Sequence, residues 1–469
     1  MSCSQVLLPL ISIPYVSRIL TPEGIGKVSF IDSLTYYFIA VAEFGIVVYG
    51  IREVARVKDD RQKLKKLVSE LLLLHIITSL FSLLLYGITV FVLWQKVGDI
   101  RLVFFSVSFL LVNFFACEWY FWGVEKFKYI TIRSLITRLL GLLSLFVLIK
   151  APGDYYIYYA ILVFAAIGNL LWNTINLFRE VPVSFKGLQW KKHIRYTWVT
   201  YLVSLFGSIL IMLDVVLLRI ASASAIAVGL YTFSIKIARV SSAVLTDMFL
   251  VLYPRTVALL NERRMEEAQQ TILKSVQLII VLAIPACAGI FLLAEPFTEV
   301  FFGKSFSTIS DNLKILALLP FIKSYSVFLS KQVLISYNKE RLYLKSLVAG
   351  SILFVVLTLL LSYYYNDKGA CYAIMITELL ILAMNYYYVK QTAPSLKVFD
   401  WVTVAQALGA VLLFIPIVWL MNRCIQPVFV ALPLAIVVCI VIYFLFQLFV
   451  LRNKLLYAVY KNGWQGFIN

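Results

Sequence analysis

Charged residues are scarce in this sequence, and their scarcity excludes an ordinary soluble protein. Asp, Glu, Lys and Arg together make up 14% of the 469 residues, whereas a soluble domain carries roughly 25%. Hydrophobic residues make up 62%, and the mean hydropathy is +0.91. Such a composition cannot cover a water-exposed surface, so most of the surface must face lipid.

Residues and motifs for metal or catalytic chemistry are also scarce. Histidine occurs only at His75 and His193. The cysteines form no CxxC pair and no zinc-ligand spacing. They stand at Cys3, Cys117, Cys287, Cys371, Cys424 and Cys439. The sequence also lacks a P-loop, a GxSxG and an HExxH motif. We therefore predict no metal site, no cofactor, no direct use of ATP and no enzymatic activity.

Long apolar segments, separated by charged or Gly/Pro turns, occupy most of the chain. They lie at about 4–20, 28–50, 66–94, 101–123, 129–150, 155–178, 196–220, 226–252, 272–294, 312–336, 343–365, 368–389, 402–422 and 428–450. A membrane barrel needs short alternating segments, whereas these segments are long and continuous. The sequence therefore predicts an all-α, polytopic bundle of about fourteen transmembrane helices.

The basic residues indicate how the bundle lies in the membrane. The net charge is +18, from 42 Lys and Arg against 24 Asp and Glu. The basic residues gather in the even-numbered loops, such as 52–66 and 179–195. Cytoplasmic loops carry this excess, so both termini are predicted to be cytoplasmic and nucleic acid is not needed to explain the charge. The first segment is short for a span, which predicts that related chains begin further upstream.

Five residue pairs recur at an almost constant shift of 201 to 204 positions. They are Arg18 and Arg219, Gly26 and Gly229, Phe30 and Phe233, Tyr49 and Tyr253, and Arg52 and Arg255. Six predicted helices separate the two copies, so both copies keep the same orientation in the membrane. We predict a six-helix bundle at 1–180 and a second at 190–390, related by pseudo-two-fold symmetry, with two additional helices at 400–452.

Several charged residues lie deep inside the predicted helices, where each costs about 2.5–3.5 kcal/mol on insertion scales. The deep cations are Arg138, Lys236, Arg239 and Lys323. Glu43 and Glu378 are also well inside, and Asp214 lies in the outer half of its helix. The carboxylates are candidates for ion coupling or for ion pairs with the cations. Arg18 lies near a helix end, where snorkelling toward the interface is an equally good explanation.

The helix at 226–252 carries a polar stripe that cannot face lipid. Thr232, Lys236, Arg239, Ala243 and Asp247 recur at three- and four-residue spacing and share one face. The stripe therefore faces a partner helix or a wet cavity. A cation-lined cavity suits an anionic substrate with polar bulk, and Lys and Arg donate charge-assisted hydrogen bonds to diphosphate oxygens.

These features favour a transporter of a lipid-linked sugar that carries a diphosphate. Three other classes of membrane protein compete with this interpretation. A drug or cation antiporter prefers a carboxylate-rich cavity, so the excess of deep Lys and Arg disfavours it. A membrane polysaccharide polymerase or ligase typically carries a large extracytoplasmic loop, and the odd-numbered loops here are short. A peptidoglycan-precursor flippase shares nearly all of the physical features.

Two segments form recognisable motifs: residues 14–26, with the sequence PYVSRILTPEGIG, and residues 118–127, with the sequence EWYFWGVEKF. The first resembles the first-helix signature of the bacterial polysaccharide-unit (O-antigen) flippases, and the second is similar to another signature of that family. The family belongs to the multidrug/oligosaccharidyl-lipid/polysaccharide exporter superfamily. Looser similarity extends over residues 1–390. The last two predicted helices, 402–422 and 428–450, lie beyond it and exceed the basic twelve helices of the family.

The resemblance implies a multi-pass protein of the bacterial inner membrane that flips an undecaprenyl-diphosphate-linked oligosaccharide for O-antigen or lipopolysaccharide biosynthesis. It implies alternating access, a proton or sodium gradient as the candidate energy source, and the polysaccharide polymerase machinery as a candidate partner. The cationic cavity of the family maps here onto Arg18, Lys236, Arg239, Arg138 and Lys323. In the second signature, we interpret Glu118, Trp119, Gly123 and Glu125 as structural or gating residues rather than substrate contacts.

Overall fold

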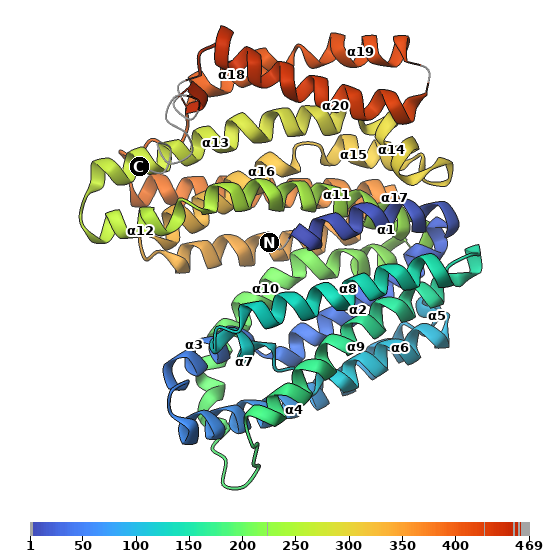
Figure 1. Cartoon of the computed structure of the whole chain (residues 1–469), viewed down its shortest axis with the longest axis vertical. Coiled ribbons are helices and arrows are strands. Elements are labelled where there is room, and N and C mark those ends of the chain that lie inside the picture. Colours follow the sequence, from blue (N-terminus) through green and yellow to red (C-terminus); the bar gives the residue numbers. More distant parts are fainter. Residues whose placement is uncertain (1–2, 223, 426, 454, 458–459, 461–469) are drawn as a thin grey trace. The chain divides into compact units, whose positions relative to one another are not determined.

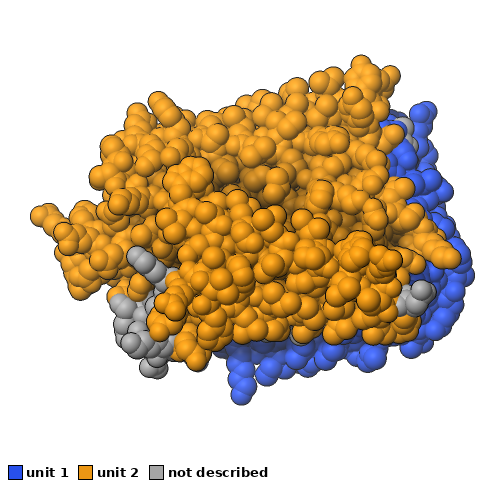
Figure 2. All heavy atoms as spheres, turned by 90° about the horizontal axis from the view of Figure 1, so that it is seen from above, with its two compact units in different colours: residues 1–229 blue, residues 230–469 orange. Residues whose placement is uncertain are grey.

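Every regular element in the computed structural model is a helix over the residues it describes, which are 3–222, 224–425, 427–453, 455–457 and 460 (Figure 1). The all-α prediction is confirmed. The chain divides into two compact units, residues 1–229 and residues 230–469, which are coloured separately in Figure 2. Each unit is described by itself.

The first unit, residues 1–229, contains ten α-helices, one 3-10 turn and the start of an eleventh α-helix, as far as its residues are described. They are α1 (Cys3–Ile19), α2 (Pro22–Glu43), α3 (Ile46–Val57), α4 (Arg61–Val92), α5 (Trp94–Val97), α6 (Ile100–Asn113), α7 (Glu118–Gly123), α8 (Phe127–Leu148), η1 (Pro152–Asp154), α9 (Tyr155–Glu180), α10 (Lys191–Ser222) and the beginning of α11 (Ala225–Leu250). Helix α2 contacts α4, α6, α9 and α10, so it lies at the centre of this unit.

The second unit, residues 230–469, contains the rest of α11 and the remaining helices of the described chain. They are α12 (Tyr253–Asn261), α13 (Met265–Leu292), α14 (Ala294–Phe302), η2 (Lys304–Phe306), α15 (Ile309–Leu316), α16 (Leu319–Val327), η3 (Phe328–Ile335), α17 (Glu340–Thr392), α18 (Trp401–Val411), α19 (Phe414–Cys424), α20 (Val428–Leu445) and η4 (Phe446–Val450). Helix α13 contacts α16 and also α18 and α19, so the C-terminal helices pack on it (Figure 1).

The helices account for all of the predicted membrane segments. Eleven described helical stretches are long and apolar enough to cross a membrane, and two shorter apolar helices, Leu10–Ile19 and Ile100–Asn113, correspond to the first and fourth predictions. One of the eleven, α17, covers two predicted segments, 343–365 and 368–389. The stretches at α11–α12 and at α15–η3 each correspond to a single predicted segment.

The interruption inside α17 folds its two halves against each other. Asn366 adopts φ 51° and ψ −128°, which is not helical. A Cβ on Gly369 would lie 2.2 Å from the carbonyl oxygen of Leu361, so the backbone turns there with no room for a side chain. Further along, the Ser346 hydroxyl donates to Asn385 Oδ1 at 2.7 Å. The two halves therefore form a helical hairpin, as the two predicted segments require.

The predicted helix at 28–50 is wrong in its continuity. Thr21 accepts a hydrogen bond from Gly24 N and, with Pro22 at the first helical position, starts α2 six residues earlier than predicted. The helix then stops at Glu43, because Phe44 and Gly45 both have positive φ, 47° and 73°. A new helix, α3, begins at Ile46. Hydropathy does not fall at this break, so an apolar pattern cannot reveal it.

The repeat seen in the sequence has a counterpart in the helix boundaries and in a contact inside the first unit. Like α2 and α3, helices α11 and α12 are separated by two residues. The repeat partners Gly26 and Gly229 also meet: a Cβ on Gly26 would lie 1.7 Å from the carbonyl oxygen of Ala225, and one on Gly229 would lie 2.0 Å from that of Pro22. The first turns of α2 and α11 are thus in backbone contact, as small residues permit between membrane helices.

The predicted division into bundles at 1–180 and 190–390, with two further helices at 400–452, stays a prediction. The compact units group helices by contact, and by that measure α10 lies with the first unit. The repeat groups helices by sequence, and by that measure α10 begins the second copy. The two criteria answer different questions about the chain.

Candidate functional site

The predicted cavity cations are distributed over both units. Arg18 lies on α1, where its side chain is exposed and Nη1 donates to the Pro14 carbonyl at 3.4 Å. Arg138 is half-buried on α8. In the second unit, Lys236 and Arg239 are half-buried on α11, and Lys323 is half-buried on α16. None of these five side chains belongs to the tightly buried core of its unit.

Helix α11 packs on α16 through a face that Arg239 shares and Lys236 does not. The Ser324 hydroxyl of α16 donates to the Ser242 carbonyl at 3.4 Å, and the Thr246 hydroxyl donates to Ser324 Oγ at 3.5 Å. Ser242 and Thr246 follow Arg239 at helical spacing on the same side of α11, whereas Ser242 is about a third of a turn away from Lys236. Both cations are half-buried.

Lys323 forms an ion pair inside the second unit. Its ammonium lies 2.6 Å from Glu378 Oε1 in the second half of α17. The two side chains differ in exposure, because Lys323 is 36% exposed and Glu378 only 3%. The structure thus brings together a predicted cavity cation and a predicted coupling or ion-pair residue. The helix then continues as η3, a π-helix, a form that is frequent at functional sites.

Neutral polar side chains connect helices of the second unit. Gln332 of η3 is fully buried, and its Nε2 donates to Thr256 Oγ1 and to Ser275 Oγ, both at 2.9 Å. Asn385 Nδ2 donates to Ser326 Oγ at 3.1 Å. Sequence reasoning missed these contacts. A signal was present in the polar residues at 326–332, but one sequence does not identify their partners.

The other two predicted carboxylates lie in the first unit. Asp214 is fully buried in α10, and its Oδ1 accepts a hydrogen bond from the backbone N–H of Val215 at 2.8 Å. Glu43 is half-buried as the last residue of α2, directly before the left-handed Phe44. It is therefore at a helix end, not within a continuous helix as predicted.

The segment 118–127 packs helix α7 tightly against α3. A Cβ on Gly50 would lie 2.9 Å from the indole of Trp119, and a Cβ on Gly123 would lie 2.6 Å from Val54 Cβ. Both α3 and α7 therefore offer a glycine to the other. At the end of α7, Glu125 adopts a φ of 60° and lies 3.3 Å from the Lys58 ammonium. These contacts place Trp119, Gly123 and Glu125 in helix packing and a turn.

Glu118 differs from its neighbours because it is exposed and tied to a buried arginine. Arg133 of α8 is 2% exposed, and its Nη2 donates to Glu118 Oε1 at 2.9 Å, while Glu118 is 48% exposed. The Arg133 Nε and Nη1 groups have no hydrogen-bond partner among the described residues. The sequence indicated Arg138 as the deep cation of this helix, whereas the structure leaves Arg138 half-buried and buries Arg133 more completely.

Both histidines serve packing inside the first unit. His75 Nε2 lies 2.8 Å from the Asn113 carbonyl oxygen. His193 lies between Tyr49 and Glu70, with Nδ1 2.8 Å from the Tyr49 hydroxyl and Nε2 3.0 Å from Glu70 Oε2. Burial lowers the pKa of His193, and the opposing effect of Glu70 is smaller. This cluster fastens the start of α10 to α3 and α4.

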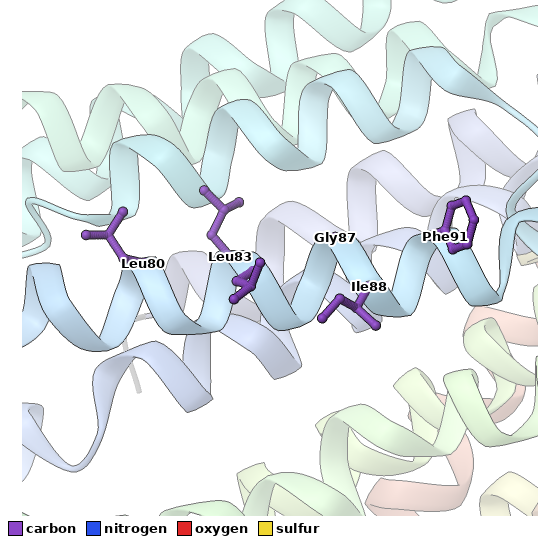
Figure 3. A pocket seen from close by; sticks show the side chains of 6 residues that line it. Leu80, Leu83, Gly87, Ile88 and Phe91 are labelled. Carbon is purple, nitrogen blue, oxygen red and sulfur yellow. The ribbon is translucent and has the colours of Figure 1, made fainter.

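Two surface hollows differ in chemistry. One, of about 550 Å³, follows a single face of α4 and is lined only by Leu80, Leu83, Leu84, Gly87, Ile88 and Phe91 (Figure 3). It offers hydrocarbon alone and suits lipid chains. The other, of about 460 Å³, lies in the second unit and is lined by Glu295, Thr298, Glu299, Gly303, Lys304, Ser307 and Ser310. Neither hollow contains a deep cation.

Comparison with known proteins places these features in a family. The family described as "Polysaccharide biosynthesis protein" matches residues 1–259, more than half of the chain. A protein of Shigella dysenteriae named "Putative O-antigen transporter" is 24% identical over 393 residues, covering 82% of this chain and 97% of its own length. A protein of the same name from Escherichia coli (strain K12) is 23% identical over 406 residues, covering 82% and 94%.

Solved structures share the fold at low sequence identity. The lipid II flippase MurJ in an inward closed conformation aligns with a TM-score of 0.72 and 12% identity, covering 96% of this chain and 97% of its own. An inward-facing multidrug resistance transporter of the MATE family and MOP superfamily aligns with a TM-score of 0.61 and 15% identity, covering 83% and 96%. At these identities the likeness concerns the fold alone.

Proposed function

Because this chain belongs to the polysaccharide biosynthesis protein family, we propose that it flips an undecaprenyl-diphosphate-linked oligosaccharide across the bacterial inner membrane. The head group passes from the cytoplasmic to the outer face by alternating access, with both termini in the cytoplasm. The names of the two relatives support an O-antigen or related repeat unit as the substrate.

One observation carries the proposal: half-buried cations occupy helices that are apolar enough to cross a membrane. Lys236 and Arg239 lie on α11 and Lys323 on α16, within two such stretches. Lipid cannot solvate an ammonium or guanidinium group within such a helix, so these groups need polar surroundings, and Glu378 supplies part of them for Lys323. Polar surroundings with a net positive charge suit a diphosphate and its hydrated sugar head.

The same observation argues against the rival functions. A multidrug or cation antiporter, a function that the MATE fold suggests, would prefer a carboxylate-rich cavity. Here Glu378 is tied to Lys323 and Asp214 is fully buried, which leaves only the half-buried Glu43 among the three predicted carboxylates. A peptidoglycan-precursor flippase shares the fold of MurJ, but the family match and the two named relatives favour a polysaccharide unit. The weakest alternative is that this chain is itself a polysaccharide polymerase. A separate polysaccharide polymerase is a candidate partner.

Complementation of a strain that lacks the gene tests the proposal. The wild-type gene should restore surface polysaccharide, and Lys236→Ala should fail to do so while the protein is present in the membrane. Lys236→Arg, which keeps the charge, should restore part of the export. Lys331→Ala, which removes an exposed lysine of η3, is the matched control and should export normally.

The location of the accumulated lipid-linked units separates the functions. A flippase defect leaves single units on the cytoplasmic face of the membrane. Single units that collect unpolymerised on the outer face would contradict the proposal and indicate a polymerase or ligase.

A further inference from the structure

The ion pair between Lys323 and Glu378 has one accessible end and one closed end. The Lys323 side chain is 36% exposed, whereas the Glu378 side chain is 3% exposed. Part of the lysine side chain is therefore open to an incoming molecule, and the carboxylate side chain is closed. A lysine also has a flexible four-carbon stem, so its charge can move while α16 stays in place.

The helices that carry the pair are held by other contacts. Asn385 Nδ2 donates to Ser326 Oγ at 3.1 Å and Asn385 Oδ1 accepts from Ser346 at 2.7 Å, which fixes α16 against both halves of α17. The Ser324 hydroxyl joins α16 to α11. The Lys323–Glu378 contact is therefore not needed to hold these helices together, and it can break without separating them.

Glu378 has little else to stabilise its negative charge. Its Oε2 atom has no hydrogen-bond partner among the described residues. The Tyr343 phenol lies within electrostatic range of both Lys323 and Glu378. Helix α11, which Ser324 joins to α16, carries the half-buried Lys236 and Arg239 and the exposed Asp247. The remaining charged groups on the elements packed around the pair are engaged with other partners or exposed. They are Asp311 with Lys368, Lys314 with Glu295, Asp367 with Asn312, Glu267 with Arg264, Lys274 near Arg255, Lys390 with the Leu396 carbonyl, and the exposed Glu266, Lys331, Glu340, Arg341 and Lys345.

An anion bound to Lys323 brings a second negative charge beside Glu378. A buried carboxylate that loses its counter-charge, or that shares one cation with another anion, favours its neutral, protonated form. The proton comes from solvent and returns to it when the anion leaves. The pair thus links the capture of an anion to the binding of a proton.

We propose that Glu378 is a built-in competitor for Lys323, and that a diphosphate group displaces it with uptake of about one proton. The inference rests on the proposed function and deepens it, because it assigns Lys323 to the diphosphate and gives Glu378 the task of releasing it. The chemistry is that of a diphosphate, whether borne by a lipid or free in solution.

Calorimetric titration with inorganic diphosphate tests the inference on the purified full chain in nanodiscs. Titrations at pH 7 in two buffers of different ionisation enthalpy count the protons bound per anion. We expect the wild type to bind about one proton more per anion than Glu378→Gln, which preserves the shape of the side chain. Protons that the diphosphate itself binds or releases are common to both proteins and cancel in this difference. Glu378→Gln should also bind diphosphate at least about tenfold more tightly than the wild type. The neutral side chain no longer competes for the Lys323 ammonium, and one charge-assisted hydrogen bond corresponds to about this change in affinity.

Matched variants separate this exchange from general electrostatics. Glu295→Gln removes a carboxylate that lies 2.5 Å from Lys314 in an exposed pair, and it should leave both affinity and proton count unchanged. Lys323→Met combined with Glu378→Gln avoids an unpaired buried charge and should lose at least about tenfold in affinity. Absence of diphosphate binding, equal proton counts in the wild type and Glu378→Gln, or equal affinity of these two proteins would each overturn the inference.

Two further experiments identify the source of the anion and distinguish a failure of this inference from a failure of the proposed function. A polyprenyl diphosphate in the nanodisc should displace inorganic diphosphate, and failure to displace it overturns the assignment to the transported lipid. If the wild type restores export but binds diphosphate without proton uptake, only this inference is wrong. If the protein binds diphosphate with proton uptake but does not restore export, only the proposed function is wrong.

Discussion

Replacing Gly26 with alanine should destabilise the protein, because the first turn of α2 touches the backbone of α11. The added Cβ would lie 1.7 Å from the Ala225 carbonyl oxygen. Real contacts of this kind stay at or above 3.0 Å, so the two helix ends must separate by roughly 1.3 Å. Neither side can rotate away, since one partner is backbone. Overpacking costs about 3 kcal/mol at its upper end, and the better helix propensity of alanine returns about 1. We expect a net loss of about 2 kcal/mol.

Thermal unfolding of the purified protein in one detergent provides the measurement. Gly229→Ala should act in the same direction, because its Cβ would lie 2.0 Å from the Pro22 carbonyl oxygen. Since one separation relieves both clashes, the double variant should lose less than the sum of the two. Gly87→Ala on α4 is the control, with nothing within 4 Å of its Cβ, and it should match or exceed wild type. A Gly26→Ala protein as stable as Gly87→Ala would refute the backbone contact.

Two further predictions concern charged groups of the first unit. Burial alone would raise the pKa of Asp99, but hydrogen bonds from Arg101 and Tyr155 outweigh it and lower the pKa to about 2 from 3.8. Asp99 therefore stabilises the fold by about 2 kcal/mol above pH 3.8, and this is lost as the pH falls toward 2. Acid titration of thermal stability should be flatter for Asp99→Asn, and an identical profile would contradict the assignment. The second prediction concerns the ion pair between Glu118 and Arg133. Glu118→Ala should lower the free energy of unfolding by about 3–5 kcal/mol, because it leaves the buried Arg133 without its counter-charge, whereas Arg133→Met should be nearly neutral. Thermal unfolding that finds Arg133→Met less stable than Glu118→Ala would contradict this prediction.

The membrane segments could be predicted because hydropathy responds to burial in lipid, which acts on every residue of a span. Even the turn inside α17 was predictable, since Asn366 and the two charged residues after it interrupt the apolar pattern. The break after Glu43 was not, because Phe44 is apolar and Gly45 is compatible with a membrane helix. Its left-handed backbone is a local conformation that hydropathy does not report.

The position of the candidate site residues along their helices could be predicted, but the residues that they contact could not. Counting residues from a helix end locates Lys323 and Glu378 inside the membrane, yet 55 positions separate them and only the folded hairpin of α17 brings them to 2.6 Å. Arg133 shows the opposite case. Near the start of α8 it counts as interfacial, but α7 and Tyr129 enclose it. Depth follows from sequence position, whereas enclosure depends on which helices pack beside the residue.

The polar residues of the second unit fall into two groups by burial, and this division bears on function. Gln332 and Asn385 are fully buried and link helices through neutral hydrogen bonds, which satisfies their polar groups within the protein. Lys236 and Arg239 are only half-buried, on a helix that is also long and apolar enough to cross a membrane. A charge inside such a helix costs more than a neutral polar side chain. Under the proposed function this cost is offset, because a diphosphate passes the two cations.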